Sequence, residues 1–194
     1  VDGTDEVSLT RALVRARRSM VEYQRYYREY LKGFEKMQLV TTGSLLGVRE
    51  TRRVMGDAVL SLEDYLRRAV FPDEIGRYAY PVDIHPLRPG KASYEQHRKE
   101  FDETLRYGKG ESYGIPYRIL TPRRLENVLV AGRCVSCDTY VHGSLRVMPG
   151  CFITGQAAGM AAALAAEAEV SVHAVDVPDL QRRLRAYGAY LPNA

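Results

Sequence analysis

The sequence has few cysteines and no long apolar run, and both shortages narrow the kind of protein it encodes. Three cysteines among 194 residues are too few, and odd in number, for a disulfide framework, so we expect a cytoplasmic protein in a reducing compartment. A membrane span needs ~18 apolar residues, and the nearest approach, residues 155–168, is interrupted by Gln156 and Glu167. We therefore expect no membrane partner.

Basic blocks and a signal peptide are also missing. The net charge is +4, but the lysines and arginines are spread along the chain and form no block interleaved with aromatic residues, so we expect no nucleic-acid partner. An anionic substrate or an anionic cofactor explains the positive charge equally well. The chain starts at Val1 with an acidic stretch and no initiator methionine, which suggests a processed or excised piece.

Hydrophobic residues make up 45% of the chain, enough for one ordinary domain with a core, and several segments have helical periodicity. Ser8 is a candidate N-cap and Gly33 a candidate stop for the first helix. The tyrosines of this helix form a wide aromatic face, which either packs into the core or makes a ligand-facing wall. Asp176 or Asp179 caps the last helix, and Gly188 ends it. The predicted helices span residues 8–32, 62–70, 150–168 and 178–187.

Between the first helix and the last third of the chain, the signals for secondary structure are weaker. Ser61 and Asp64 fit a capping box that starts a short helix. Residues 86–113 have the composition of a long loop, with a helical turn around 95–105. Strand composition marks residues 37–42, 48–54 and 80–85.

The last third carries the most ordered pattern. Residues 127–131 are a continuous apolar run, typical of a strand buried on both faces of a parallel sheet, and Gly132 ends this run. Pro149 suits the first turn of the long helix that follows. The many small residues of that helix allow another backbone to come close.

The start of this long helix is the first candidate for chemistry. We expect the amides of Gly150, Cys151 and Phe152 to lack partners within the helix, and the helix dipole places about half a positive charge there. With no side chain at Gly150, a phosphate or the carbonyl edge of a flavin ring would approach closely and be stabilised. The same strand, glycine and helix also occur in many parallel-sheet domains as a purely structural feature.

Long runs around this helix resemble a known family. They are similar to the carboxy-terminal end of FAD-dependent oxidoreductases, in the flavoprotein group that also contains fumarate reductase-like enzymes. The resemblance covers nearly the whole chain from about residue 8. It implies FAD as the cofactor and a parent enzyme that transfers hydride between a substrate and N5 of FAD. The runs are residues 127–136, 142–149 and 155–165, with further similar segments at 47–53, 80–85 and 115–118.

The resemblance also implies which residues contact the cofactor. A turn after the apolar run comes beside the ribityl and pyrophosphate region, and the helix start points its amides at the pyrimidine edge of the isoalloxazine. Two residues of the next helical turn lie along the same face. The cofactor-binding residues implied are Ala131, Gly132, Arg133, Met148, Pro149, Gly150, Cys151, Gln156 and Ala157.

Substrate contacts are implied in the same way. His142 and Arg146 are loosely like the substrate-binding histidine and arginine of fumarate reductase-type enzymes and would orient or protonate the substrate, with Arg49 and Arg52 lining the same cavity. Plainer explanations exist, because His142 can bond a backbone carbonyl in a loop, and the two arginines, with Arg53, can form a salt-bridged face. Arg146 precedes a helix start that repels cations, so its position needs an anionic partner.

Cys134 and Cys137 form a CxxC pair. They are either two small residues that follow a buried strand, or a redox pair, or half of a zinc site. Because no second CxxC and no nearby histidine pair accompanies them, we expect no metal site.

One half of the family's fold has no counterpart here. A full member begins with a strand, a GxGxxG turn and a helix that hold the FAD pyrophosphate, whereas the glycines at 108, 110 and 114 follow no predicted strand and open no helix. We therefore expect an incomplete α/β fold of the FAD/NAD(P)-binding type, with a substrate and cap region over residues 1–120 and the carboxy-terminal part of the FAD-binding domain over 121–194. A missing amino-terminal half or partner chain would complete the enzyme, and this chain alone would be inactive. The alternative is a non-catalytic fragment that binds no flavin and forms homo-oligomers.

Overall fold

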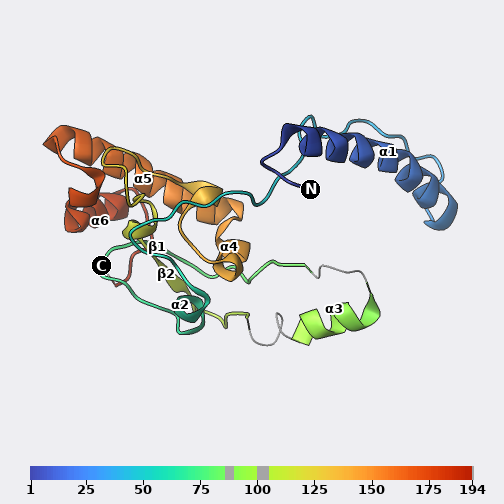
Figure 1. Cartoon of the computed structure of the whole chain (residues 1–194). Coiled ribbons are helices and arrows are strands. Elements are labelled where there is room, and N and C mark those ends of the chain that lie inside the picture. The colour runs from blue at the N-terminus through green and yellow to red at the C-terminus, as the bar shows by residue number, and fades with distance from the viewer. Residues whose placement is uncertain (86–89, 100–104, 194) are drawn as a thin grey trace. The chain divides into compact units, whose positions relative to one another are not determined.

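The computed structural model describes residues 1–85, 90–99 and 105–193. The chain divides into two compact units, residues 1–52 and residues 53–194 (Figure 1). We describe each unit by itself. The predicted division near residue 120 concerns which functional region each segment belongs to, and it stays a prediction.

One long helix dominates the 1–52 unit. Helix α1 (Glu6–Tyr30) confirms the predicted amphipathic helix, but its N-cap is Asp5, whose carboxylate accepts hydrogen bonds from the amides of Val7 and Ser8, both at 3.1 Å. Asp5 lies one turn earlier than the predicted cap and reaches two of the free amides at once. Gly33 has φ +94°, which confirms a left-handed stop just after the helix.

The chain after α1 folds back along the helix without forming strands. The Arg28 side chain donates two hydrogen bonds to the carbonyl of Met37, at 3.0 and 2.8 Å. The predicted strands at 37–42 and 48–54 are wrong for the residues described, because a strand needs a neighbouring ladder and none runs beside them. No residue of the 1–52 unit is buried, so the tyrosine face of α1 builds no core there.

A small antiparallel sheet lies in the 53–194 unit. Strand β1 (Glu74–Tyr78) pairs with β2 (Tyr113–Pro116), with Gly76 opposite Ile115 and an irregularity between Glu74 and Gly76. The predicted strand at 80–85 is wrong. Two side chains take the place of a neighbouring strand there: Ser144, on helix α4 (Thr139–Leu145), bonds the carbonyl of Tyr80, and Arg146, directly after that helix, bonds the carbonyl of Asp83.

The helices of the 53–194 unit follow local sequence signals closely. The capping box at Ser61 and Asp64 is present, and Asp176 caps the last helix. The predicted short helix is shorter than expected, and the turn expected around 95–105 lies partly outside the described residues. The helices are α2 (Leu62–Leu66), α3 (Lys91–Arg98), α4 (Thr139–Leu145), α5 (Met148–Ala168) and α6 (Val177–Ala186), with 3-10 turns η2 (Tyr117–Ile119), η3 (Gly132–Cys134) and η4 (Val172–Ala174).

The core of this unit packs the sheet against α4, α5 and α6 (Figure 1). Gly76 of β1 lies against Ile153 of α5, so closely that a Cβ on the glycine would sit 2.6 Å from the isoleucine Cγ2. This close approach explains why β1 carries a glycine at its centre. The largest fully buried side chains include Leu60, Tyr65, Ile75, Tyr113, Ile115, Ile119, Leu120, Leu145, Leu180 and Leu184.

The apolar run 127–131 forms no strand, since Asn127 lies in a turn and residues 128–131 have no regular secondary structure. This corrects the prediction. The amide of Val130 donates a hydrogen bond to the carbonyl of Leu120 at 2.9 Å, but no ladder of such bonds follows along the described part of this segment. An apolar segment with β-type residues forms a strand only beside another strand. The segment therefore keeps strand composition without a ladder.

Asp138 ties two helices together, and its removal gives a first testable expectation. Its carboxylate caps α4 by accepting from the amide of Val141 at 2.8 Å, and it also accepts from the amide of Leu62 at the start of α2. Asp138→Ala should lower the free energy of unfolding by about 2 kcal/mol, because two helix-start amides lose their acceptor. Asp176→Ala removes a single cap bond from α6 and should lower the free energy of unfolding by about 1 kcal/mol. Urea titrations measure both variants. Equal losses would show that the link to α2 adds nothing.

Candidate functional site

Three segments that are separate in the sequence converge in the 53–194 unit: the turn η3, helix α4 and the first turns of α5. Gly132, at the start of η3, has φ +73°, a conformation that favours glycine. Its amide donates to Oγ1 of Thr154 on α5 at 2.9 Å. The structure thus brings the predicted turn 131–133 against the predicted helix.

His142 lies on α4 and is 1% exposed. Its Nε2 lies 2.9 Å from the carbonyl oxygen of Arg133. This contact matches the plainer of the two sequence interpretations, in which the histidine bonds a backbone carbonyl. His142 therefore holds the turn η3 against α4, and its predicted role in catalysis stays a prediction.

Arg146 follows α4 directly and is also buried. Its Nη2 donates to the carbonyl of Asp83 at 2.6 Å, so a backbone carbonyl faces the guanidinium beside the positive end of α5. The backbone carbonyl of Arg146 accepts from Nε of Arg133 and from Sγ of Cys151, both at 3.4 Å. Arg146 thus joins the extended segment 80–85 to the turn η3 and to α5.

The start of α5 differs in one respect from the prediction. The helix begins at Met148, so the amide of Cys151 donates to the carbonyl of Val147 at 3.1 Å and is not free. Gly150 is buried, and a Cβ there would lie 2.3 Å from the carbonyl oxygen of Leu145. The glycine is therefore required by contact with α4, whereas the sequence suggested contact with a ligand.

Tyr78 is a site residue that the sequence did not indicate. Its hydroxyl oxygen is buried and faces the backbone amide of Gly150. Burial raises the pKa of Tyr78, and the facing amide of Gly150 lowers it by a smaller amount. Because this tyrosine lies on β1, far from α5 in the sequence, no local signal links it to the helix start.

An open groove of about 610 Å³ reaches the first turn of α5. Its walls are mostly rings: Tyr78 and Tyr80 stack with centroids 6.3 Å apart, and Tyr190 is largely exposed. Pro81 and Pro149 complete the apolar lining, with polar groups from residues 110–112 at the rim. The groove is open, and its rings and prolines offer apolar contact to a flat ring, beside the charged side chains of Arg77 and Glu111.

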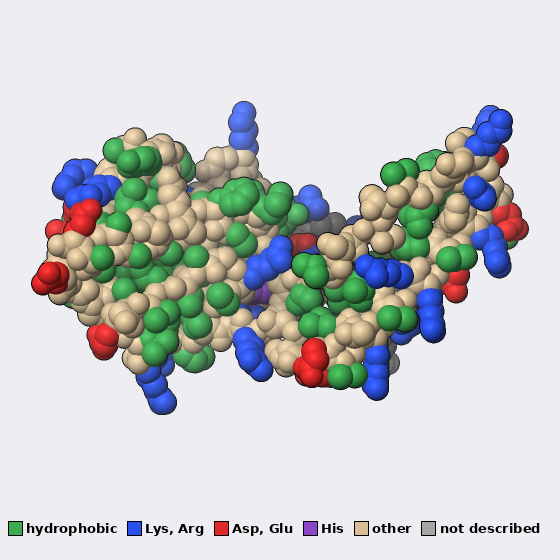
Figure 2. Space-filling view, turned by 90° about the horizontal axis from the view of Figure 1, so that it is seen from above, with side chains coloured by type: hydrophobic (Ala, Val, Ile, Leu, Met, Phe, Trp, Pro, Cys, Tyr) green, Lys and Arg blue, Asp and Glu red, His purple; other side chains and the backbone are tan. Residues whose placement is uncertain are grey.

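The outer face of α5 is exposed and carries small residues. Phe152 is 67% exposed, and no atom lies within 4 Å of a Cβ placed at Gly155 or Gly159. Gln156 is also exposed, whereas Ala157 is fully buried in the core, so these two predicted cofactor contacts lie on different faces of the helix. Apolar side chains spread over the face of this unit that Figure 2 shows.

The remaining candidate residues form no second cluster. Arg49 and Arg52 are exposed and belong to the 1–52 unit, so their predicted role in substrate binding stays a prediction. None of the three cysteines forms a disulfide bond, and the described residues contain no group of three His, Cys, Asp or Glu side chains placed to bind a metal. No single helix in the described part of the chain is long and apolar enough to cross a membrane, although the bent pair α4 and α5 passes on length and composition.

Comparison with known proteins identifies the family. The model of the family described as FAD dependent oxidoreductase matches residues 1–184, which is nearly the whole chain. No curated protein and no solved structure matches. The mixture of helices with a small sheet is compatible with an α/β domain of such an enzyme. The chain belongs to the FAD-dependent oxidoreductase family, whose cofactor is FAD.

Proposed function

We propose that this chain is the carboxy-terminal part of an FAD-dependent oxidoreductase related to fumarate reductase-like enzymes, and that it forms one wall of the flavin site. The observation that carries the proposal is the convergence of η3, α4 and the first turn of α5 beside the aromatic groove. The same segments carry the runs that resemble the family. The substrate is a small molecule, and the positive charge of the chain favours an anionic one.

The residues present fit a flavin in the groove but not against the Cα of Gly150. The ring faces of Tyr78, Tyr80 and Tyr190, together with Pro81 and Pro149, offer apolar contact. The space in front of Gly150, in contrast, is filled by Leu145. When bound, FAD supplies the hydride acceptor or donor at N5. Burial raises the pKa of Tyr78, so its hydroxyl stays protonated.

In this proposal the buried polar residues position the site. His142 holds the carbonyl of Arg133, and Arg146 holds the segment that carries Tyr80 and Pro81. Both therefore act on the groove through backbone that they hold in place. Direct contact of His142 or Arg146 with substrate would require access that the described structure does not provide, since both side chains are buried.

We also propose that another segment or chain completes the enzyme. Two features support this. The apolar run 127–131 has no neighbouring strand among the described residues, and the outer face of α5 carries exposed Phe152, Gly155 and Gly159. A strand from another segment would pair with the run, and a further backbone would pack closely on the exposed face of the helix. The dinucleotide-binding half expected for the family would supply them.

The test is flavin content, measured after acid release from two purified proteins. The proposal expects little FAD in the 194-residue chain alone and one FAD per molecule in the chain joined to the sequence that precedes it in its reading frame. Gly159→Arg in the longer protein should abolish FAD retention, because the arginine blocks the outer face of α5 without touching the core. Ala168→Arg, at the exposed end of the same helix, is the control and should retain FAD.

A longer protein that contains no flavin would contradict the proposal and favour a non-catalytic fragment. Retention of FAD by Gly159→Arg would contradict the part of the proposal that concerns docking on α5.

A further inference from the structure

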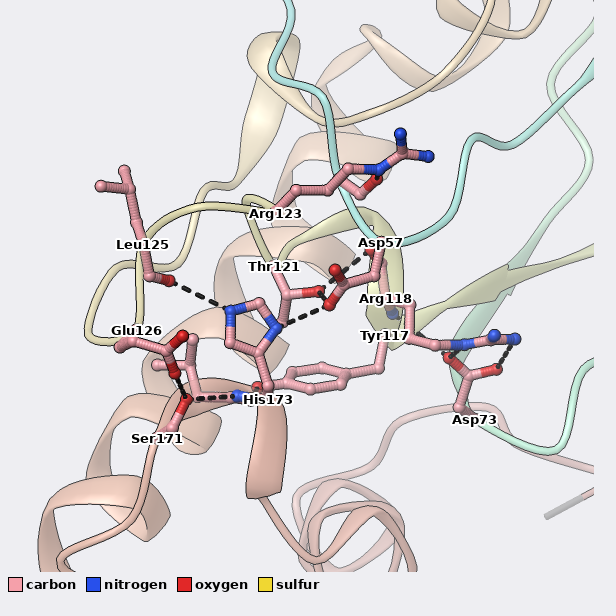
Figure 3. Close-up of polar contacts among 12 residues, drawn as sticks. Asp57, Asp73, Tyr117, Arg118, Thr121, Arg123, Leu125, Glu126, Ser171 and His173 are labelled. Carbon is pink, nitrogen blue, oxygen red and sulfur yellow. Dashed lines mark hydrogen bonds and ion pairs between the residues drawn. The ribbon is translucent and has the colours of Figure 1, made fainter.

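His173 lies on the turn η4, which connects α5 to α6, and is none of the residues assigned to the candidate flavin site. Its Nδ1 is 2.6 Å from Oδ2 of Asp57, and its Nε2 is 3.1 Å from the carbonyl oxygen of Leu125 (Figure 3). Both partners are acceptors. A neutral imidazole carries one N–H and the imidazolium carries two, so only the charged form donates to both.

The surroundings of Asp57 keep its carboxylate ionised, so that it can pair with a charged histidine. The hydroxyl of Thr121 donates to the same Oδ2 at 2.7 Å. Burial by itself raises the pKa of Asp57, but the hydrogen bonds from Thr121 and His173, together with nearby Arg123, lower it below its ordinary value. Asp57 is therefore ionised in the range where His173 titrates, and the contact is a charge-assisted hydrogen bond.

The other charged groups described next, near His173, have hydrogen-bond or ion-pair partners of their own. The Glu126 carboxylate, which favours the charged histidine, accepts from Oγ of Ser171 at 2.7 Å. Nε of Arg123 donates to the carbonyl of Gly56 at 2.8 Å. Arg118 is paired with the Asp73 carboxylate at 3.0 Å, away from the imidazole (Figure 3).

The other nearby titratable group is Tyr117, which stays neutral. Its hydroxyl donates to the carbonyl of Val172 at 2.7 Å, and burial raises its pKa to about 12. The hydrogen bond to Asp57 raises the pKa of His173 more than any other interaction does, and burial lowers that pKa by a smaller amount. The result is a pKa above the ordinary 6.5.

These contacts join three segments of the unit. Asp57 belongs to the loop before α2, Leu125 and Glu126 lead into the apolar run 127–131, and His173 belongs to η4. The amide of Val172 also donates to the carbonyl of Glu126 at 3.0 Å. The junction therefore fixes the start of the apolar run against the connection between α5 and α6.

We propose that His173 is a pH-sensitive clasp, which in its charged form ties the α5–α6 connection to both Asp57 and Leu125, and in its neutral form holds only one of them. The sign follows from linkage. A histidine with a raised folded-state pKa adds stability that is fully present below its unfolded pKa of 6.5, and that stability is lost as the pH rises through the folded pKa. The start of the run 127–131 is then held less firmly at alkaline pH.

The test combines an NMR titration of the histidine rings with amide exchange at Val172 in the full chain. The ring of His173 should titrate above 6.5, and its pKa should fall in Asp57→Asn, which keeps an acceptor but removes the charge. Opening at the Val172 amide, corrected for intrinsic exchange, should rise about fivefold as His173 loses its proton, the loss expected for one hydrogen bond. In His173→Gln this rise should vanish.

His85 provides the matched control. It also faces an aspartate, Asp83 at 3.3 Å, but its side chain is 63% exposed, and His85→Gln should leave the pH profile at Val172 unchanged. A His173 ring that titrates at or below 6.5 would overturn the proposal. So would exchange at Val172 that keeps the same pH dependence in wild type and in His173→Gln. If the variants fold poorly, the wild-type titration and exchange profile still decide between the two outcomes.

Discussion

Replacing Arg77 by methionine is expected to lower the free energy of unfolding by about 3 kcal/mol, the largest effect of any substitution considered. Nη1 of Arg77 lies 2.6 Å from Oε1 of Glu74, and the two side chains are only 7% and 0% exposed. Arg77 also donates to the hydroxyl and the carbonyl of Ser112. Methionine fills similar space but leaves the Glu74 carboxylate buried without its cation, and that desolvated charge causes the loss.

The pH dependence of this variant carries a second, independent expectation. Burial raises the pKa of Glu74 even in the wild type, although the Phe71 amide and Arg77 oppose the rise. A carboxyl whose folded pKa is raised destabilises the fold above that pKa and less so as the pH falls toward its ordinary 4.5. Without Arg77 the pKa rises further. The deficit of Arg77→Met should therefore shrink in acid, as Glu74 takes up a proton.

Arg67→Met is the control for the buried pair. Arg67 pairs with Asp64, but its side chain is 61% exposed, and an exposed pair contributes about 0–1 kcal/mol. Urea titrations at neutral and acidic pH measure both variants. Equal losses for Arg67→Met and Arg77→Met, or a deficit for Arg77→Met that does not change in acid, would show that burial of the Glu74–Arg77 pair is not what matters.

Gly150→Ala is expected to have the second largest effect, a loss of about 1–3 kcal/mol from overpacking. The new Cβ would lie 2.3 Å from the carbonyl oxygen of Leu145 and 3.1 Å from its carbonyl carbon. Backbone cannot yield as a flexible side chain does, so α4 and α5 must move apart. Because Arg146 and Cys151 lie at the same junction, the variant should also weaken FAD binding by the completed enzyme.

Gly155→Ala on the same helix provides the comparison. No atom lies within 4 Å of a Cβ at Gly155, so the alanine adds helix propensity without a clash and should stabilise the protein by about 1 kcal/mol. Thermal or urea unfolding of the two variants should thus give shifts of opposite sign. Two losses of equal size, or a gain at position 150, would contradict the role given to the contact with Leu145.

Helices could be predicted from this sequence because their signals are local. The capping box at Ser61, the proline at 149 and the cap at Asp176 each act within one turn of their own helix. Helix α4 was missed since its cap, Asp138, precedes a seven-residue segment with glycine near its centre, too short for a clear period.

Strands could not be predicted equally well, because pairing is set by distant segments. Residues 80–85 and 127–131 have strand composition, yet side chains or single backbone bonds occupy their polar groups. Strand β1, in contrast, forms where β2 lies beside it 39 residues later in the register Gly76 to Ile115. Composition reports a preference, and a ladder needs a neighbour.

The candidate site, too, could be predicted only where its signals are local. The turn 131–133, the pair His142 and Arg146 and the start of α5 were named from sequence, and the structure brings them together. The contacts that define their surroundings were not accessible from sequence, because Tyr78 and Asp83 come from other elements. In the structure the amide of Gly150 faces Tyr78, and the open space lies in the tyrosine-lined groove.

Amide hydrogen exchange in the presence and absence of FAD tests the central claim most directly. In the protein that binds FAD, the account predicts slower exchange in residues 131–134 and in the first turns of α5, with no change within α6, none of whose residues lines the groove. FAD binding that slows exchange only outside these segments would contradict the claim that the start of α5 and the turn η3 form the flavin wall.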